Sequence, residues 1–169
     1  EILDYIRRLG ALVGAGDKAS AYADGLQRGL EAIEREAAAL PMRPRVYFEE
    51  WDEPPITGIR WVAELIRIAG GDDIFPERAL EPLAKARILE DAGEVIRRAP
   101  DLILGSWCGK KFRPEKVAAR PGWDAIPAVR DGQMFEIKSP IILQPGPAAL
   151  TDGVNEIARI VRAWAAQRG

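Results

Sequence analysis

Residues 45–71, RVYFEEWDEPPITGIRWVAELIRIAGG, carry the clearest signal of the fold class in this sequence. Residues 45–51 are rich in β-branched and aromatic side chains and run into an Asp-Glu-Pro-Pro sequence at 52–55, which predicts a strand followed by a loop. Residues 59–69 then place apolar side chains at helical spacing and end on two glycines, which predicts a helix. A strand followed by a helix is the repeating unit of an α/β domain.

The same alternation continues toward the C-terminus. Strands are predicted at 101–104 and 133–137, with shorter extended stretches at 73–75 and 87–89. A helix is predicted at 91–98, where Asp91 and Glu94 have capping-box spacing, and an apolar stripe from Leu150 to Trp164 marks a terminal helix. We therefore expect an α/β fold, a Rossmann-like lobe with a mostly parallel central sheet, helices on both faces and right-handed crossovers.

Two helices are predicted before the first strand. Residues 2–13 form a short amphipathic pattern that stops at a glycine-rich exit, and a longer stripe covers 18–40, with Asp17 as the expected cap. At about 1.5 Å per residue the second helix is roughly 33 Å long, as long as a small domain is wide. The chain thus joins a long helix to an α/β domain.

Composition excludes several classes of function. The 169 residues are 47% hydrophobic and 30% charged, which fits one globular domain with some extra helix. The 24 basic and 26 acidic residues are interspersed, so no basic face is available for nucleic acid. The sequence has no histidine and one cysteine, Cys108, which removes histidine catalysis, Cys/His zinc sites and an intramolecular disulfide.

Two loops that follow predicted strands carry unusual residues. Ligands of open α/β sheets collect at the carboxyl ends of the strands. The loop at 49–58 holds Trp51 among four carboxylates, and the loop at 105–112 holds Trp107 between glycines, beside hydroxyl, thiol and ammonium groups. An indole offers a large flat apolar face with one N–H donor, so two of them facing one cleft would suit a large, partly planar ligand.

Other interpretations of these loops remain open. The tryptophans could simply cover the edge of the sheet. Cys108 could be a nucleophile, but the sequence offers no histidine as its base. The carboxylates at 49–53 could hold a hard cation, although their spacing matches no calcium loop. We expect neither a catalytic residue nor a metal ligand, and we expect Trp61, which shares a helical face with Leu65 and Ile68, to support the core.

Four segments carry a resemblance to a known family. They are RVYFEEWDEP at 45–54, AELIRIAGG at 63–71, APDLI at 99–103 and GWDAIPAVRDG at 122–132. With the SWCGKK loop at 106–111 they resemble the cobalamin and iron-chelate branch of periplasmic binding proteins, whose two lobes are joined by one long helix. The helix with its two glycines and the Ala-Pro-Asp segment are common to the wider family and imply only the fold.

The resemblance implies a division of the chain. On this basis residues 1–16 are the last helix of an N-terminal lobe that precedes this chain, 17–43 are the bridging helix, and 44–169 are the C-terminal lobe. The ligand would lie between two lobes, so we expect the isolated chain to bind weakly and to dimerise through uncovered apolar surface.

The resemblance also implies a function. The chain would be part of an extracytoplasmic solute-binding component of an ABC transporter, periplasmic or membrane-anchored, which hands cobalamin or a related corrinoid to the permease. Haem or an iron siderophore is the alternative ligand, and no covalent cofactor is implied. The implied ligand contacts are Trp51, Trp107, Glu50, Asp52, Ser106, Cys108 and Lys110; the implied permease contacts are Asp124 and Glu115.

Two functions of another kind compete with this one. A small α/β hydrolase or transferase would use Cys108 or the carboxylate cluster. A scaffold domain would present the stripe from Tyr22 to Leu40 to a partner helix.

Overall fold

A computed structural model describes residues 1–168. Its centre is a sheet in which β1 (Arg45–Asp52), β4 (Leu102–Gly105) and β5 (Met134–Glu136) run parallel. β2 (Pro55–Thr57) turns back antiparallel beside the end of β1, and β3 (Asp72–Asp73) pairs in parallel with its start. The order β2-β1-β4-β5 confirms the expected α/β fold with a mostly parallel sheet.

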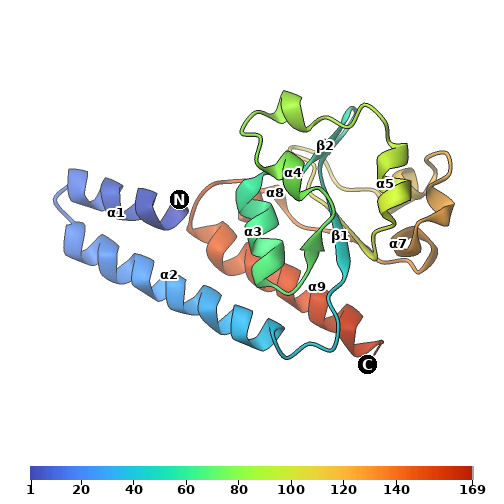
Figure 1. Ribbon diagram of the computed structural model, residues 1–169. Helices are drawn as coiled ribbons and strands as arrows, with labels where there is room; N and C mark the ends of the chain where they lie inside the picture. The colour runs from blue at the N-terminus through green and yellow to red at the C-terminus, as the bar shows by residue number, and fades with distance from the viewer. Residues whose placement is uncertain (169) are drawn as a thin grey trace.

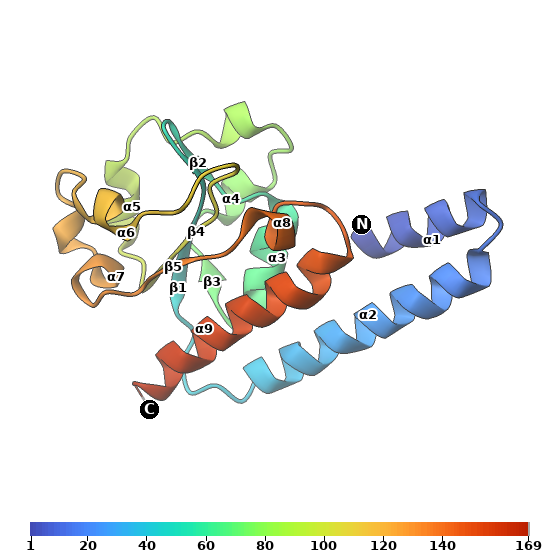
Figure 2. The same cartoon turned by 180° about the vertical axis from the view of Figure 1, so that it is seen from behind.

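Helices cover both faces of this sheet (Figures 1 and 2). On one face α3 (Arg60–Ile68) and α9 (Val154–Ala166) bury apolar side chains against Val46 and Phe48 of β1. On the other face α5 (Gly93–Arg98), α6 (Pro114–Ala118) and α7 (Pro127–Arg130) surround a core that includes Tyr47. β1 thus alternates its side chains between two cores, as a fully covered strand must.

The first two helices form a hairpin that extends away from this body (Figure 1). α1 (Ile2–Leu12) and α2 (Gly16–Ala37) are the two predicted helices, and the second half of α2 packs beside α3 and α9. The expected cap is wrong: α2 begins at Gly16, so Asp17 lies within its first turn and makes no capping bond. Gly10 brings the two helices close together, because a Cβ on it would lie 2.1 Å from that of Ala19.

Other differences lie in short elements. Residues 87–89 are not a strand: a 3₁₀ turn (Ala84–Arg87) leads to Ile88, which makes one isolated bridge with Ile56. The expected loop after β1 contains β2, so the two prolines sit in a hairpin. Four short helices escaped prediction because they have too few residues to show a period; they are α4 (Pro76–Ala79), α6, α7 and α8 (Ser139–Ile142).

The end of the chain is one continuous helical segment. A π-helical turn (Ala149–Gly153) runs directly into α9, so helical backbone begins close to the predicted Leu150. A 3₁₀ turn (Trp123–Ala125) precedes α7. No helix within residues 1–168 combines the length and the apolarity that a membrane span needs. The expected division into a preceding lobe, a bridge and a C-terminal lobe stays a prediction.

Candidate ligand-binding site at the carboxyl edge of the sheet

β1 and β4 end side by side. Glu49 is the register partner of Gly105, and the backbone N–H of Ser106 donates to the Glu49 carbonyl at 2.9 Å. A side chain on Gly105 is excluded, because its Cβ would lie 1.9 Å from the Phe112 ring. The loops that follow the two strands are therefore neighbours at one edge, as expected from the sequence.

Lys110 joins these two loops. Its ammonium group pairs with the carboxylate of Asp52 and lies 4.2 Å from the centre of the Trp51 ring and 5.2 Å from that of Trp107. The Asp52 side chain is only 3% exposed, whereas that of Lys110 is 39% exposed. The indole N–H of Trp51 donates to the Glu53 carbonyl at 3.0 Å. Two indoles, one ammonium and one buried carboxylate thus form a single unit, in which the cation gains from both π faces.

Glu49 lies beneath this unit and is fully buried. Its carboxylate accepts from the Tyr47 hydroxyl at 3.0 Å and the Trp107 indole N–H at 3.1 Å. Arg120 donates to both of its oxygens, at 2.6 and 2.9 Å. A buried carboxylate is stable only when hydrogen bonds satisfy it, and here four donors do so. Glu49 therefore fixes the orientation of the Trp107 ring.

The two titratable partners of Glu49, Tyr47 and Arg120, have shifted pKa values. Burial raises the pKa of Tyr47 well above its ordinary value, and the nearby carboxylate of Glu49 raises it further. Burial is the largest single effect on the pKa of Arg120 and lowers it, but the hydrogen bonds to Glu49 and the electrostatic attraction of Glu49 and neighbouring acidic groups together raise the pKa. Both side chains therefore stay protonated at neutral pH and donate to Glu49.

Glu50 faces another buried base. Its carboxylate accepts from the Arg87 guanidinium at 2.6 and 3.3 Å, and that guanidinium, 2% exposed, also donates to the Thr57 carbonyl. This contact ties the segment after α4 to the β1–β2 hairpin. The Ser106 hydroxyl, on the residue directly before Trp107, is buried and makes no hydrogen bond with any described residue.

The acidic loop does not gather its carboxylates around one point. Glu49 pairs with Arg120, Glu50 with Arg87 and Asp52 with Lys110, so each buried acid has its own base. Within residues 1–168 no group of three or more acidic or sulfur side chains is arranged to hold a metal ion. The cation-binding interpretation of this loop therefore finds no geometric support.

The residues predicted to contact the ligand differ in how far they are exposed to solvent. Trp51 and Glu50 are half-buried, Cys108 and Lys110 are exposed, and Asp52, Ser106 and Trp107 are buried. Trp107 is 3% exposed and packs edge-on against Phe112 at 5.0 Å between ring centres. An open stacking face was expected for Trp107, and the described conformation offers none; Trp107 supports the site from below.

The two predicted permease contacts lie elsewhere. Glu115 is in the first turn of α6, with a 70% exposed side chain whose nearest base is Arg113 at 3.9 Å. Asp124 is exposed on the 3₁₀ turn before α7. Their role in docking stays a prediction.

Sequence reasoning missed Arg87 and Arg120. Arg120 lies 71 residues from Glu49, and no spacing rule connects two positions that far apart. The sequence did indicate that Glu49 is buried, because side chains alternate along a strand and Glu49 lies on the same face as Tyr47. A buried carboxylate needs a basic partner, although the sequence does not say which residue that is.

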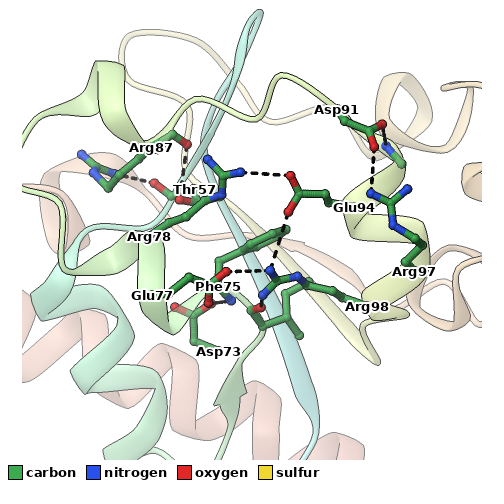
Figure 3. A network of polar contacts seen from close by, with 12 residues as sticks. Thr57, Asp73, Phe75, Glu77, Arg78, Arg87, Asp91, Glu94, Arg97 and Arg98 are labelled. Carbon is green, nitrogen blue, oxygen red and sulfur yellow. Dashed lines mark hydrogen bonds and ion pairs between the residues drawn. The ribbon is translucent and has the colours of Figure 1, made fainter.

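A second polar network lies between α4 and α5 (Figure 3). Arg98 donates to Glu77 at 2.6 Å and lies 3.6 Å from Glu94, which also accepts from Arg78 at 3.0 Å. The Arg98 guanidinium stacks 4.2 Å from the centre of the Phe75 ring. Since Arg78 and Arg98 both pair with acidic side chains, this network holds the two helices together.

Ligands of open α/β sheets commonly bind at the carboxyl ends of the strands, where this lobe carries polar and aromatic loops. A profile of the periplasmic binding protein family matches residues 1–141. The chain therefore belongs to the periplasmic binding protein family. No protein with a curated description is similar enough to count as a relative.

Solved structures with the same fold include three informative ones. A periplasmic binding protein from Veillonella parvula is 22% identical with a TM-score of 0.79, over 96% of this chain and 56% of that chain. Staphylococcus aureus IsdE, complexed with haem, is 18% identical with a TM-score of 0.79, over 95% and 63%. The periplasmic vitamin B12 binding protein BtuF of Vibrio cholerae is 20% identical with a TM-score of 0.69, over 96% and 61%. The chain thus spans less than two thirds of the length of each.

Proposed function

We propose that this chain is the C-terminal lobe of an extracytoplasmic receptor that delivers a large metal chelate to the permease of an ABC importer. A corrinoid such as cobalamin is the ligand we favour, and haem or an iron siderophore is the alternative. Membership of the periplasmic binding protein family supports the transport role. Similar structures carry haem or vitamin B12 in their names, which supports a chelate and leaves its identity open.

One observation carries the proposal for the site. The half-buried Trp51, the exposed Lys110 and the buried Asp52 meet where β1 and β4 end, above a fully buried Glu49. An apolar ring face beside fixed polar groups suits a large ligand that is partly planar and partly polar. We propose a binding role without catalysis: the exposed Cys108 would need a base, and the sequence contains no histidine.

The test is calorimetric titration of cobalamin, cobinamide, haem and a ferric siderophore into the full-length protein that carries this chain. Truncating an aromatic anchor commonly costs about 2 kcal/mol, so Trp51→Ala should weaken binding roughly thirtyfold. Trp107→Ala should weaken binding and also lower the melting temperature, because its ring is buried. Binding to a corrinoid alone would support the cobalamin proposal.

Trp61 is the matched control. Its ring packs against the core, and its indole N–H donates to the Ile142 carbonyl at 2.9 Å, away from the strand-end loops. Trp61→Ala should therefore lower stability with affinity unchanged. Unchanged affinity in Trp51→Ala, or a loss in Trp61→Ala as large as in Trp51→Ala, would contradict the proposed site.

A further inference from the structure

The outer layer of the strand-end site is cationic, and its acids lie underneath. Four carboxylates at this edge are largely covered, with side-chain exposures of 0% for Glu49, 3% for Asp52, 21% for Glu50 and 22% for Glu136. Lysine ammonium groups lie above two of them: Lys110 pairs with Asp52, and Lys138, 65% exposed, pairs with Glu136 at 2.7 Å. Glu53, on the β1–β2 turn, is the exposed exception.

Lys110 differs from the two arginines of this edge, because it is held in place by an ion pair and is also accessible. The side chains of Arg87 and Arg120 are 2% and 17% exposed, and their guanidinium groups form ion pairs with Glu50 and Glu49. Lys110 cannot leave Asp52 without stranding a buried carboxylate, which costs several kcal/mol. Its side chain is nevertheless 39% exposed.

The Lys110 ammonium has unused capacity. An ammonium group carries three N–H donors. Its nitrogen forms an ion pair with Asp52, no hydrogen bond to that carboxylate is formed, and within residues 1–168 no other acidic side chain lies within ion-pair distance. The neighbouring ring faces of Trp51 and Trp107 stabilise the charge and supply no oxygen acceptor. A ligand group that binds here therefore meets a cation that is already in position, so the entropic cost of ordering the lysine side chain on binding is small.

We propose that Lys110 recognises an acidic group, a carboxylate or a phosphate, on the rim of a flat apolar ligand. This inference rests on the proposed function and names the chemical class of its ligand. The charge supplies the preference for an anion, and the half-buried Trp51 ring beside it supplies the preference for an anion attached to an apolar body.

Paired ligands that differ in their peripheral acidic groups and keep the same ring provide the test. Haemin is compared with its dimethyl ester, and cyanocobalamin with the derivative in which one peripheral amide is hydrolysed to a carboxylate, by calorimetry on the full-length protein. A hydrogen bond to a charged group favours the acid form by roughly tenfold or more in wild type. Lys110→Gln leaves the buried Asp52 without its base and should weaken both forms, the acid form more, so that the preference for the acid form is lost.

Two control variants isolate the charge of Lys110. Lys111→Gln changes the adjacent exposed lysine and should keep the preference for the acid form. Lys110→Arg retains the positive charge and should keep most of the preference for the acid form. A preference lost in Lys110→Gln and kept in Lys110→Arg is therefore due to the charge. Equal wild-type affinity for both forms, or equal weakening of both in Lys110→Gln, would overturn the role of Lys110 while leaving the proposed function intact. Failure of every chelate to bind would overturn the proposed function itself.

Discussion

Glu49 is the residue on which the strand-end site depends most. It is fully buried and accepts four hydrogen bonds, from Tyr47, Trp107 and Arg120. Glu49→Gln would leave the Arg120 guanidinium without its counter-charge and turn an amide N–H toward its donors, so we expect unfolding to become easier by about 3 kcal/mol or more. Urea unfolding measures this directly. Glu115→Gln, at an exposed weak pair, should stay within about 0.5 kcal/mol; equal effects would contradict the support role of Glu49.

Asp73 makes stability depend on pH. Burial raises its pKa to about 6, while its acceptance of the Phe75 N–H and the proximity of Arg98 lower it and Glu77 raises it. The folded state thus holds the proton more tightly than the unfolded chain does. The resulting stability is present below the unfolded pKa near 3.8 and is lost as pH rises through about 6.

Asp73→Asn should therefore stabilise the protein at pH 7, by about 1 to 3 kcal/mol, and give little gain below about pH 4. Asparagine keeps an oxygen acceptor for the Phe75 N–H, so the local turn is preserved. Urea unfolding at the two pH values provides the measurement. A gain of equal size at both would show that ionisation of Asp73 is not its cause.

For single residues, the sequence predicted the loops of the site but not which side chains pair there or how deeply they are buried. The two loops and their tryptophans were identifiable, because they follow strands whose pattern is strong. The bases Arg87 and Arg120 were not, because their acids lie 37 and 71 residues away. Burial of Trp107 was missed because it depends on Phe112 packing over Gly105, a tertiary contact that no local pattern encodes.

At the scale of elements, the long periodic segments were predicted well. α2, α3, α9, β1 and β4 lie within a few residues of their expected positions, since each shows a clear helical or strand pattern. β2 was taken for a loop because its Pro-Pro start lacks strand character. Residues 87–89 were taken for a strand because apolar side chains follow one another there, whereas Arg87 in fact reaches Glu50 from a 3₁₀ turn.

Two glycines of the helical hairpin should respond oppositely to alanine. Gly10→Ala would place a Cβ 2.1 Å from that of Ala19, so α1 must move away from α2 and stability should fall by about 1 to 3 kcal/mol. Gly29 is exposed within α2 with nothing near its missing Cβ, so Gly29→Ala should raise stability by about 0.5 to 1 kcal/mol. Thermal melts of the two variants and the wild type measure these changes in stability. Stabilisation by both would show that the hairpin is not closely packed at Gly10.

At the scale of the whole molecule, the free end of the hairpin is apolar. Leu12 and Val13 at the turn are 84% and 71% exposed, and Tyr5, toward the other end of α1, is 61% exposed. Contiguous apolar surface promotes association, so we expect the 169-residue chain to self-associate as its concentration rises, and Leu12→Lys with Val13→Lys to reduce this. Light scattering over a wide concentration range measures it. A strictly monomeric wild-type chain would contradict the expectation.

In the proposed binding site, the ligand contacts the loops at the carboxyl ends of β1 and β4. Hydrogen exchange of the full-length protein, with and without a saturating chelate, tests the location most directly, because amides covered or ordered by ligand exchange more slowly. We expect the amides of this chain that the ligand protects to lie mainly in residues 51–58 and 106–112. The competing location is the hollow of about 760 Å³ between α1, α2 and α3, lined by Leu30, Trp61 and Leu150. Protection there, with the two strand-end loops unchanged, would contradict the proposed site.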